Sequence, residues 1–338
     1  MKPKALLMTS DKENCLKVYE QTVIDALAHE VEWLEPIFDI NELDSRAEDL
    51  ACTEYIFSTW GMFELSDADI KKYLKKLKAV FYSAGTVKYF AEPFIANDIA
   101  VFSAWAANAV PVAEFTVAQI ILAGKGYFQR LHRAMPDSVT WENRTVCTDV
   151  TGNYGNRIGL IGIGMIGSLV AEMLKNYKLE VWGYDPFMSE EKAAALGIKK
   201  TEDLSELFRE CNIISNHLAN NDQTAGILNK NCFDVMKKDA VFINTGRGRQ
   251  VVRDDLVEAL KKEPLRVALL DVTYPDEPPL DGDELYRMPN VFLSPHIAGS
   301  IGNEVHRMSW YMYDEFMNFI NSKPVKYRVT AQMLKTMA

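Results

Sequence analysis

Cysteine is scarce in this chain, and its distribution excludes two kinds of stabilisation. The 338 residues include five scattered cysteines with no Cys-x-x-Cys pair: Cys15, Cys52, Cys147, Cys211 and Cys232. A structural zinc site needs clustered ligands, and a disulfide framework uses closely spaced cysteines in even number. We therefore expect reduced thiols, a cytosolic location and no structural metal.

Basic residues are also too few for a nucleic-acid-binding face. Lys and Arg number 37 against 47 Asp and Glu, so the net charge is -10 at pH 7. A protein that binds a phosphate backbone presents a cluster of basic side chains. This balance argues against nucleic acid as a partner, but it leaves room for a local basic site that binds a small anion.

Long apolar runs are missing as well. The uncharged run 99–113 has 15 residues and contains Asn108 and Pro111, whereas a helix that crosses a membrane needs about 20 apolar residues. Only four apolar residues separate Lys4 from Thr9, too few for the core of a signal peptide. We expect no membrane-spanning helix and no membrane partner.

The chain does contain a regular alternation of short apolar runs and amphipathic stretches. Its length fits two domains of about 150 residues, and its 48% apolar and 25% charged residues are typical of a globular protein. The alternation predicts an α/β protein with doubly wound parallel sheets. We expect strands at 5–8, 55–58, 79–82, 99–102, 157–162, 180–184, 212–216, 240–243, 266–270 and 291–293.

The expected helices occupy the amphipathic stretches. Apolar residues at three- and four-residue spacing predict helices at 16–28, 68–77, 165–177, 203–210, 254–262 and 302–320. One long helix is expected at 112–131, with Pro111 at its start. The polar stretch 135–155 is expected to be a loop or an extended arm, and 323–330 a segment that returns to the fold.

A glycine-rich turn joins the first strand and helix of the second half. Residues 157–167 read RIGLIGIGMIG, a Gly-x-Gly-x-x-Gly motif. Its glycines permit a tight turn, close approach of a pyrophosphate and packing of the helix on the strand, and the helix N-terminus favours an anion. The motif predicts a dinucleotide site, although a methyltransferase can use the same βαβ unit. The expected contact residues are Gly162, Gly164, Met165, Ile166 and Gly167.

A carboxylate ends the next expected strand. Asp185 lies 18 residues after Gly167, at the position from which an acidic side chain binds the hydroxyls of adenosine ribose. Pro186 and Phe187 come next, with no Arg or Lys to receive a 2′-phosphate. We therefore expect NAD rather than NADP as the cofactor.

Three polar motifs stand at the ends of later strands, where open α/β sheets bind ligands. Arg247 lies between two glycines in the string NTGRG, and a guanidinium there can bind a carboxylate through two hydrogen bonds. Asp271 ends the strand that leads into the acidic, proline-rich loop 274–279. His296 lies in the string SPHIAG, and a histidine beside an acid can act as general acid or base near neutral pH.

Taken together, these motifs resemble the D-isomer-specific 2-hydroxyacid dehydrogenases. In the first half, KLKAVFYSAGT (76–86) is similar to the family's substrate-carboxylate loop, and NAVPVAE (108–114) to its N-A-x-x-V-A-E helix start. The likeness covers nearly the whole chain. It implies a Rossmann NAD-binding domain at 109–299 and a smaller, flavodoxin-like catalytic domain built from both termini, 1–108 and 300–338.

The resemblance implies an activity and two catalytic residues. Arg247 would bind the substrate carboxylate and polarise the 2-keto oxygen, and His296 would exchange the hydroxyl proton. The implied reaction is the NAD-dependent interconversion of a D-2-hydroxy acid and its 2-keto acid. Relatives dimerise through the cofactor domain, so a homodimer is expected, with the stretch 135–155 as the arm that crosses to the partner.

The resemblance also implies binding residues. Asp271 and the backbone near Thr245 would place the nicotinamide beside His296. The main-chain N–H groups that would hold the substrate carboxylate belong to Ala84, Gly85 and Thr86.

The acidic partner of His296 has two candidates. Counting five residues from Asp271 leads to Asp276, the offset of the family's Glu. In the family that Glu directly precedes a proline, and here the residue before Pro278 is Glu277. Proline pushes the residue before it to extended conformations, and Glu is one methylene longer, so Glu277 is favoured and Asp276 stays the alternative.

Departures from the family pattern leave alternatives open. The string HLANN (217–221) stands where the family has H-x-P-x-T, so the contact to the cofactor there is in question.

The alternative function is an NAD(H)-sensing interaction protein that keeps the fold, as in the family's corepressors. A formate dehydrogenase is disfavoured because its histidine pairs with an amide. Trp60 and Tyr274 are candidates for the substrate pocket, or core aromatics.

Overall fold

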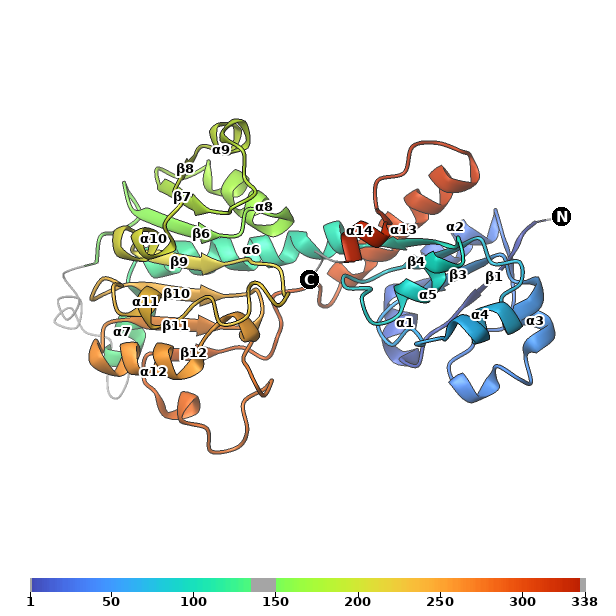
Figure 1. Cartoon of the computed structure of the whole chain (residues 1–338), viewed down its shortest axis with the longest axis horizontal. Coiled ribbons are helices and arrows are strands. Elements are labelled where there is room, and N and C mark those ends of the chain that lie inside the picture. Colours follow the sequence, from blue (N-terminus) through green and yellow to red (C-terminus); the bar gives the residue numbers. More distant parts are fainter. Residues whose placement is uncertain (1, 135–149, 335–338) are drawn as a thin grey trace. The chain divides into compact units, whose positions relative to one another are not determined.

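The computed structural model describes residues 2–134 and 150–334, and the chain forms two compact units. The terminal unit combines 1–108 with 300–338, and the central unit comprises 109–299. Each unit contains one sheet with helices on both faces (Figure 1). The expected fold class, two α/β domains with doubly wound sheets, is therefore confirmed.

The terminal unit has a six-stranded sheet in the order β13-β5-β4-β3-β1-β2. The strands β1 to β5 are parallel to one another, and their spatial order, β2-β1-β3-β4-β5, is the flavodoxin-like order. The last strand, β13, pairs antiparallel with β5. This antiparallel edge strand departs from the expected all-parallel sheet. The strands are β1 (Lys4–Leu7), β2 (Glu32–Trp33), β3 (Tyr55–Ser58), β4 (Ala79–Tyr82), β5 (Ala100–Ser103) and β13 (Arg328–Val329).

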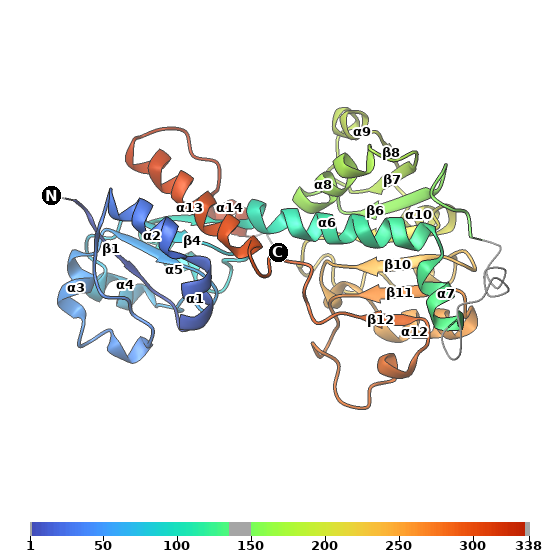
Figure 2. The ribbon, with the colours of Figure 1, turned by 180° about the vertical axis from the view of Figure 1, so that it is seen from behind.

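Two apolar layers cover this sheet. Leu6, Ile56 and Val80 pack into one layer, and their strand neighbours pack into the other. Because β3, β4 and β5 are buried along their whole length, they are nearly continuous apolar runs in the sequence. Figures 1 and 2 show the two faces. The first is covered by α3 (Ala47–Cys52), α4 (Asp67–Tyr73), α5 (Ala91–Ala96) and α14 (Ala331–Leu334), and the second by α1 (Lys12–Val18), α2 (Gln21–Ala28) and α13 (Glu304–Ile320).

The central unit has a seven-stranded sheet in the order β12-β11-β10-β9-β6-β7-β8. All its strand pairs are parallel, and the order is that of a Rossmann sheet with one further strand. The strands are β6 (Arg157–Ile161), β7 (Glu180–Tyr184), β8 (Ile198–Lys200), β9 (Ile213–Asn216), β10 (Val241–Asn244), β11 (Val267–Leu270) and β12 (Val291–Leu293).

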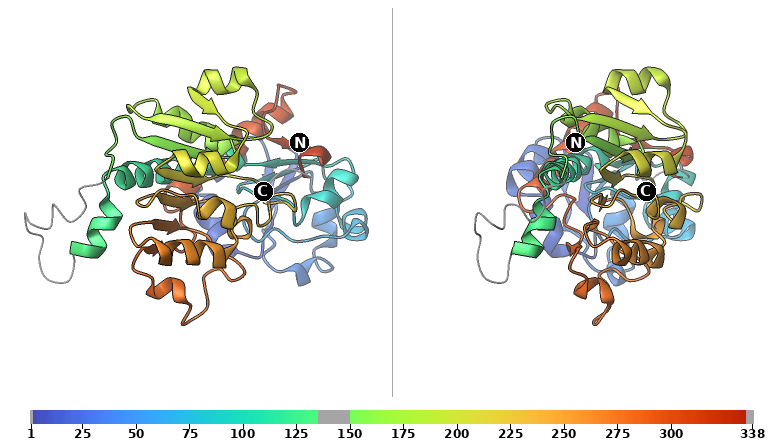
Figure 3. Two further views of the ribbon diagram at one scale, coloured as in Figure 1. Left: turned by 60° about the vertical axis from the view of Figure 1, so that its left-hand side comes forward. Right: turned by 90° about the vertical axis from the view of Figure 1, so that its left-hand side faces the viewer.

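Helices cover both faces of the central sheet as well. One apolar layer contains α6 (Trp105–Gly124), α8 (Met165–Leu174) and α9 (Glu190–Leu196). The other contains α10 (Leu204–Glu210), α11 (Lys230–Phe233) and α12 (Arg253–Lys262). Figures 2 and 3 show these layers from behind and in turned views. The chain therefore places its earlier helices on one face and its later helices on the other, with the change of face between α9 and α10, as a doubly wound topology requires.

The helix expected at 16–28 is in fact two helices, so that expectation was wrong. Tyr19 ends α1, and Glu20 is extended at the start of α2. The buried hydroxyl of Tyr19 lies 3.0 and 3.1 Å from the carbonyl oxygens of Ser58 and Phe81. A tertiary contact, which the helical spacing of apolar residues does not reveal, thus determines where the first helix ends.

The long helix begins earlier and ends earlier than expected. α6 starts at Trp105, so Pro111 lies inside it rather than at its start. The helix ends at Gly124, because Gly126 has a left-handed φ of +62° that breaks the helical path before α7 (Tyr127–Ala134). Most of the expected arm at 135–155, and Cys147 within it, lies outside the described residues.

α6 is also long and apolar enough to cross a membrane by length and composition alone. Its most apolar window has a mean hydropathy of 1.5, and half of that window is buried inside the protein. Ala113, Val117 and Ile120 pack into the core of the central unit. The apolar composition of α6 is therefore explained by its packing on the sheet.

Candidate active site

The ends of the central strands bring most of the expected site residues to one edge of the sheet. Because β6, β7, β9, β10, β11 and β12 are parallel, their carboxyl ends share that edge. The chain leaves β6 toward one helical layer and β9 toward the other. Open α/β sheets bind ligands at such a switch point, so the fold places a binding site where the glycine-rich turn lies.

The glycine-rich turn has the shape of a pyrophosphate cradle. A Cβ atom at position 167 would lie 2.1 Å from the carbonyl oxygen of Gly162, so only glycine allows α8 to start this close to β6. No described atom lies within 4 Å of a Cβ built at position 164, and Met165 is 47% exposed. The turn is thus open where the N-terminal N–H groups of α8, Met165 and Ile166 included, can meet an anion.

Asp185 is held beside this turn by two backbone donors. Ile163 N donates to one carboxylate oxygen at 2.7 Å, and Phe187 N donates to the other at 2.8 Å. A carboxylate oxygen can accept more than one hydrogen bond, and Asp185 stays partly exposed. Its position therefore fits a contact to ribose hydroxyls.

A lysine lies near the same turn, which the sequence interpretation missed. Lys192, in α9, donates from Nζ to the carbonyl oxygen of Ile163. The sequence interpretation considered only Pro186 and Phe187, because the sequence alone does not show that the fold returns Lys192 to this turn. The charge of Asp185 is therefore the feature from which we expect a preference for NAD over NADP.

Replacement of Asp185 by Ala is expected to narrow the preference for NAD(H). In the unmodified protein we expect NADH to be preferred by about tenfold or more in kcat/KM, because a charge-assisted hydrogen bond contributes about 1.5–3 kcal/mol and 1.4 kcal/mol is tenfold. Steady-state kinetics with NADH and NADPH measure this ratio. The exposed Asp222 supplies a matched control, Asp222→Ala. Equal kcat/KM for both cofactors in the unmodified protein would contradict the assignment.

The loop after β10 presents Arg247. A Cβ atom at position 248 would lie 2.0 Å from the carbonyl oxygen of Thr273, so Gly248 lets this loop approach the start of the acidic loop. The hydroxyl of Thr245 lies 3.0 Å from that of Thr116 in α6. Burial lowers the pKa of the Arg247 guanidinium, and the charge of Glu277 opposes that shift.

The loop that carries His296 is held by Asp271. This buried carboxylate accepts from the Ser294 hydroxyl at 2.6 Å and from the backbone N–H groups of Ile297 and Ala298, each at 2.9 Å. His296 N also donates to the Asp271 carbonyl at 3.1 Å. The backbone of His296 has a φ of +55°, which costs free energy in a residue other than glycine. Asp271 therefore holds a strained loop that points His296 outward.

Glu277 contacts the imidazole of His296. Oε1 of Glu277 forms a hydrogen bond with Nδ1 of His296, and Glu277 also interacts with the charge of Arg247. For Asp276 the structure gives a backbone contact, in which its carbonyl oxygen accepts from the Thr273 hydroxyl at 2.6 Å. Of the two acids in this loop, Glu277 is thus the one that lies against His296.

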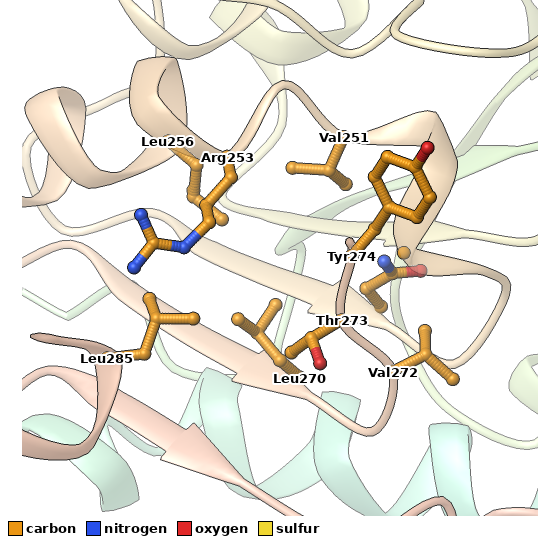
Figure 4. A pocket seen from close by; sticks show the side chains of 10 residues that line it. Val251, Arg253, Leu256, Leu270, Val272, Thr273, Tyr274 and Leu285 are labelled. Atoms are coloured by element: carbon orange, nitrogen blue, oxygen red, sulfur yellow. The ribbon is translucent and has the colours of Figure 1, made fainter. Parts of the chain in front are cut away.

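The pocket around Glu277 and His296 is lined by both polar and apolar side chains. It measures about 310 Å³ and is lined by Glu277 and His296 together with the apolar Pro278, Pro279 and Leu293. Tyr274 lines a different, smaller pocket between the acidic loop and α12, with Arg253 and several aliphatic side chains (Figure 4). Within the central unit, Tyr274 is therefore placed apart from the pocket of His296.

Replacement of Glu277 by Gln is expected to move the alkaline limb of the kcat/KM profile for reduction to lower pH. Gln keeps the shape of the side chain but removes the negative charge next to Nδ1 of His296, and an opposite charge nearby generally favours the charged form of a titratable group. Asp276→Asn is the matched control and should leave the profile in place. A shift in the control instead would transfer the role to Asp276, and no shift in either variant would remove the acid from the mechanism.

A second histidine at this edge has a different environment. His217 follows β9 and is buried, with Nε2 3.0 Å from the Ser215 hydroxyl, and burial lowers its pKa to about 4. His217 is therefore a neutral imidazole near pH 7 and carries no imidazolium proton to donate there. His296 is the candidate acid and base of the two.

The expected carboxylate loop belongs to the terminal unit. Ala84, Gly85 and Thr86 follow β4, and exposure increases along them from the buried Ala84 to the exposed Thr86. The Ser103 hydroxyl lies 2.9 and 2.5 Å from the carbonyl oxygens of Ala84 and Gly85, and its one proton is shared between them. This contact holds the backbone of the loop against β5. Trp60, in the same unit, packs partly buried against both of its apolar layers.

Residues 2–134 and 150–334 contain no group of three or more His, Cys, Asp or Glu side chains that could hold a metal ion. The four cysteines described there, which exclude Cys147, form no disulfide.

Comparison with known proteins identifies the family. The model described as "D-isomer specific 2-hydroxyacid dehydrogenase, NAD binding domain" matches residues 119–298, more than half of the chain. The chain is 28% identical over 264 residues to the D-3-phosphoglycerate dehydrogenase of Archaeoglobus fulgidus, which is 78% of this chain and 49% of that protein. It is 29% identical over 219 residues to the (S)-sulfolactate dehydrogenase of Chromohalobacter salexigens, 64% of this chain and 69% of that protein. The chain belongs to the D-isomer-specific 2-hydroxyacid dehydrogenase family.

A solved structure agrees with this fold. The apo D-mandelate dehydrogenase of Rhodotorula graminis superposes with a TM-score of 0.81 and 98% coverage of both chains, at 18% identity. The aligned region spans between 41% and 49% of the length of four curated relatives. The family resemblance seen in the motifs is confirmed.

Proposed function

We propose that this protein is an NAD-dependent oxidoreductase that interconverts a D-2-hydroxy acid and its 2-keto acid. The observation that carries the proposal is the grouping of Arg247, Glu277 and His296 at the edge of the sheet that also holds the glycine-rich turn and Asp185. A guanidinium, an acid–base histidine and a dinucleotide site are the three parts that this reaction needs.

Each part has a chemical task. The planar fork of Arg247 binds the substrate carboxylate and polarises the 2-keto oxygen. Nδ1 of His296 faces Glu277, so Nε2 is the nitrogen that donates a proton to the keto oxygen during reduction and accepts it during oxidation. Bound NADH supplies the hydride.

The cofactor assignment rests on residues of the central unit. The open turn at Gly162, Gly164 and Gly167 suits a pyrophosphate, and Asp185 suits the ribose hydroxyls. Asp271 and Thr245 stand at neighbouring strand ends, where they can position the nicotinamide. In this proposal 109–299 is the NAD-binding domain.

The terminal unit, 1–108 and 300–338, is proposed as the catalytic domain that binds substrate. Ser103 holds the backbone of Ala84 and Gly85 in place, which suits a loop whose N–H groups receive a carboxylate. Reduced, scattered cysteines favour a cytosolic location.

The test is oxidation of NADH in the presence of a panel of 2-keto acids, with binding of NADH measured separately. Turnover of at least one keto acid supports the dehydrogenase. Tight binding of NADH without any turnover would favour an NAD(H)-sensing interaction protein, and no binding of NADH would overturn the proposal. The same panel identifies the substrate.

A homodimer, which the family resemblance of the sequence implies, is part of the proposal. We expect light scattering at micromolar concentration to give about twice the chain mass of 38.3 kDa. A mass near that of one chain would contradict this expectation.

A further inference from the structure

A buried glutamine lies beside Arg247 and uses every hydrogen bond that its side chain can make. Gln250 is fully buried, in the short 3-10 helix Gly248–Gln250. Its Nε2 donates to the carbonyl oxygens of Leu218 at 2.7 Å and Ala219 at 3.0 Å. Its Oε1 accepts from Asn216 Nδ2 at 2.6 Å and from Arg247 N at 3.3 Å. A carboxamide has two N–H donors and two lone pairs, so all four are engaged.

Two asparagines extend this hydrogen-bond network, so that it reaches both the backbone N–H and the backbone carbonyl oxygen of Arg247. Asn216 and Asn244 end β9 and β10 and are paired in register, and Asn216 Nδ2 donates to Asn244 Oδ1 at 3.0 Å. Asn244 Nδ2 in turn donates to the Arg247 carbonyl oxygen at 3.1 Å. The N–H of Arg247 is therefore held by Gln250, and its carbonyl oxygen by Asn244.

The other end of the network holds the loop after β9. The family's H-x-P-x-T has Ala219 at the position of its proline, and proline would restrict the backbone there through its ring. Here the two carbonyl oxygens of Leu218 and Ala219 are instead fixed by one side chain. This loop leaves the same edge of the sheet as the glycine-rich turn.

We propose that Gln250 is a positioning residue that locks the Arg247 loop and the 217–219 loop together, and that it replaces the missing proline as the constraint on the latter. The inference rests on the proposed function, in which Arg247 binds substrate and the edge next to β9 binds NAD(H). It predicts that the side chain of Gln250 affects both kinds of binding without touching either ligand.

Two variants distinguish the hydrogen bonds that Gln250 accepts through Oε1 from those that it donates through Nε2. Gln250→Met keeps the length of the side chain and removes all four hydrogen bonds. It is expected to raise both the Kd for NADH, measured by fluorescence without substrate, and the KM for the keto acid by about tenfold, the change expected when buried partners lose their hydrogen bonds. Gln250→Glu keeps the oxygen that faces Asn216 and Arg247 but loses the donors to Leu218 and Ala219. It is expected to raise the Kd for NADH while KM stays within about twofold.

Asn290 supplies the matched control for a purely structural effect. It is a buried amide that also bridges two carbonyl oxygens, those of Leu260 at 3.1 Å and Arg266 at 2.8 Å, but it precedes β12 and so lies at the opposite edge of the sheet. Asn290→Leu is expected to lower Tm and to leave the Kd for NADH and KM unchanged.

The outcomes distinguish this inference from the proposed function. Folded Gln250→Met or Gln250→Glu protein with wild-type Kd and KM would overturn the inference, as would changes in Asn290→Leu equal to those in Gln250→Met at the same loss of Tm. If Gln250→Met does not fold, the Kd of Gln250→Glu decides. Failure of the wild-type protein to bind NADH or reduce any keto acid would instead overturn the proposed function.

Discussion

His296→Ala is expected to lower kcat for keto-acid reduction by about 10²–10⁴-fold, the usual contribution of general acid–base catalysis. The imidazole contacts Glu277 through Nδ1, and the left-handed backbone at position 296 directs it out of the loop that Asp271 holds. Alanine removes the proton donor and leaves the bonds that Asp271 makes to Ile297 and Ala298. Steady-state kinetics measure the loss, and fluorescence should show that NADH still binds.

His306 offers a control of the same chemistry. Its Nδ1 lies 3.5 Å from a carboxylate oxygen of Glu20 in the terminal unit, so it is also a histidine paired with an acid, but on α13. His306→Ala should keep kcat within about twofold of the unmodified value, as surface changes away from a site usually do. A kcat for His296→Ala close to that of His306→Ala would show that His296 is not the acid–base group.

Arg247→Lys is expected to lower kcat/KM by about 10²-fold or more, the cost of losing a donor that stabilises developing charge. A guanidinium offers five N–H donors in a planar fork, whereas an ammonium is a compact charge that cannot bind a carboxylate in the same bidentate way. Arg247 is partly buried, and burial lowers the pKa of its guanidinium. Charge alone therefore does not replace it at this position.

Arg249, two residues along the same loop, provides the matched comparison. Its guanidinium pairs with Asp222 at 2.8 Å, and the two side chains are 40% and 94% exposed. Exposed ion pairs contribute about 0–1 kcal/mol, so Arg249→Lys should be nearly neutral in both kcat/KM and Tm. If Arg247→Lys behaves like Arg249→Lys, the proposed role of Arg247 in binding the carboxylate is wrong.

Much of the fold could be predicted because parallel strands buried on both faces leave continuous apolar runs. The strands at 55–58, 79–82, 180–184 and 291–293 have the expected bounds. Helix ends were less predictable, since Tyr19 ends α1 through contacts to two distant strands. Pro111 was expected to start a helix, but the sequence does not reveal that α6 extends through it from Trp105.

The candidate site also contains residues that the sequence predicted and a residue that it did not. The glycine-rich turn, Asp185, Arg247 and His296 were found from the sequence because each follows a strand in a recognisable string. Gln250 was missed because a single polar residue in a loop resembles a surface side chain. The one available signal was that the successive strands IISN (213–216) and VFIN (241–244) both end in asparagine, which places two amides side by side in a parallel sheet.

The sequence by itself determined the family, the alternation of strands and helices, and the residue types that carry the proposed chemistry, because these depend on local order along the chain. Only the tertiary structure decided which groups meet. It set Glu277 rather than Asp276 against His296 and brought Lys192 back to the turn beside Asp185. It also joined the loops of Arg247 and Ala219 through Gln250. Hydrogen bonds act over about 3 Å, and which side chains come that close depends on how distant segments pack.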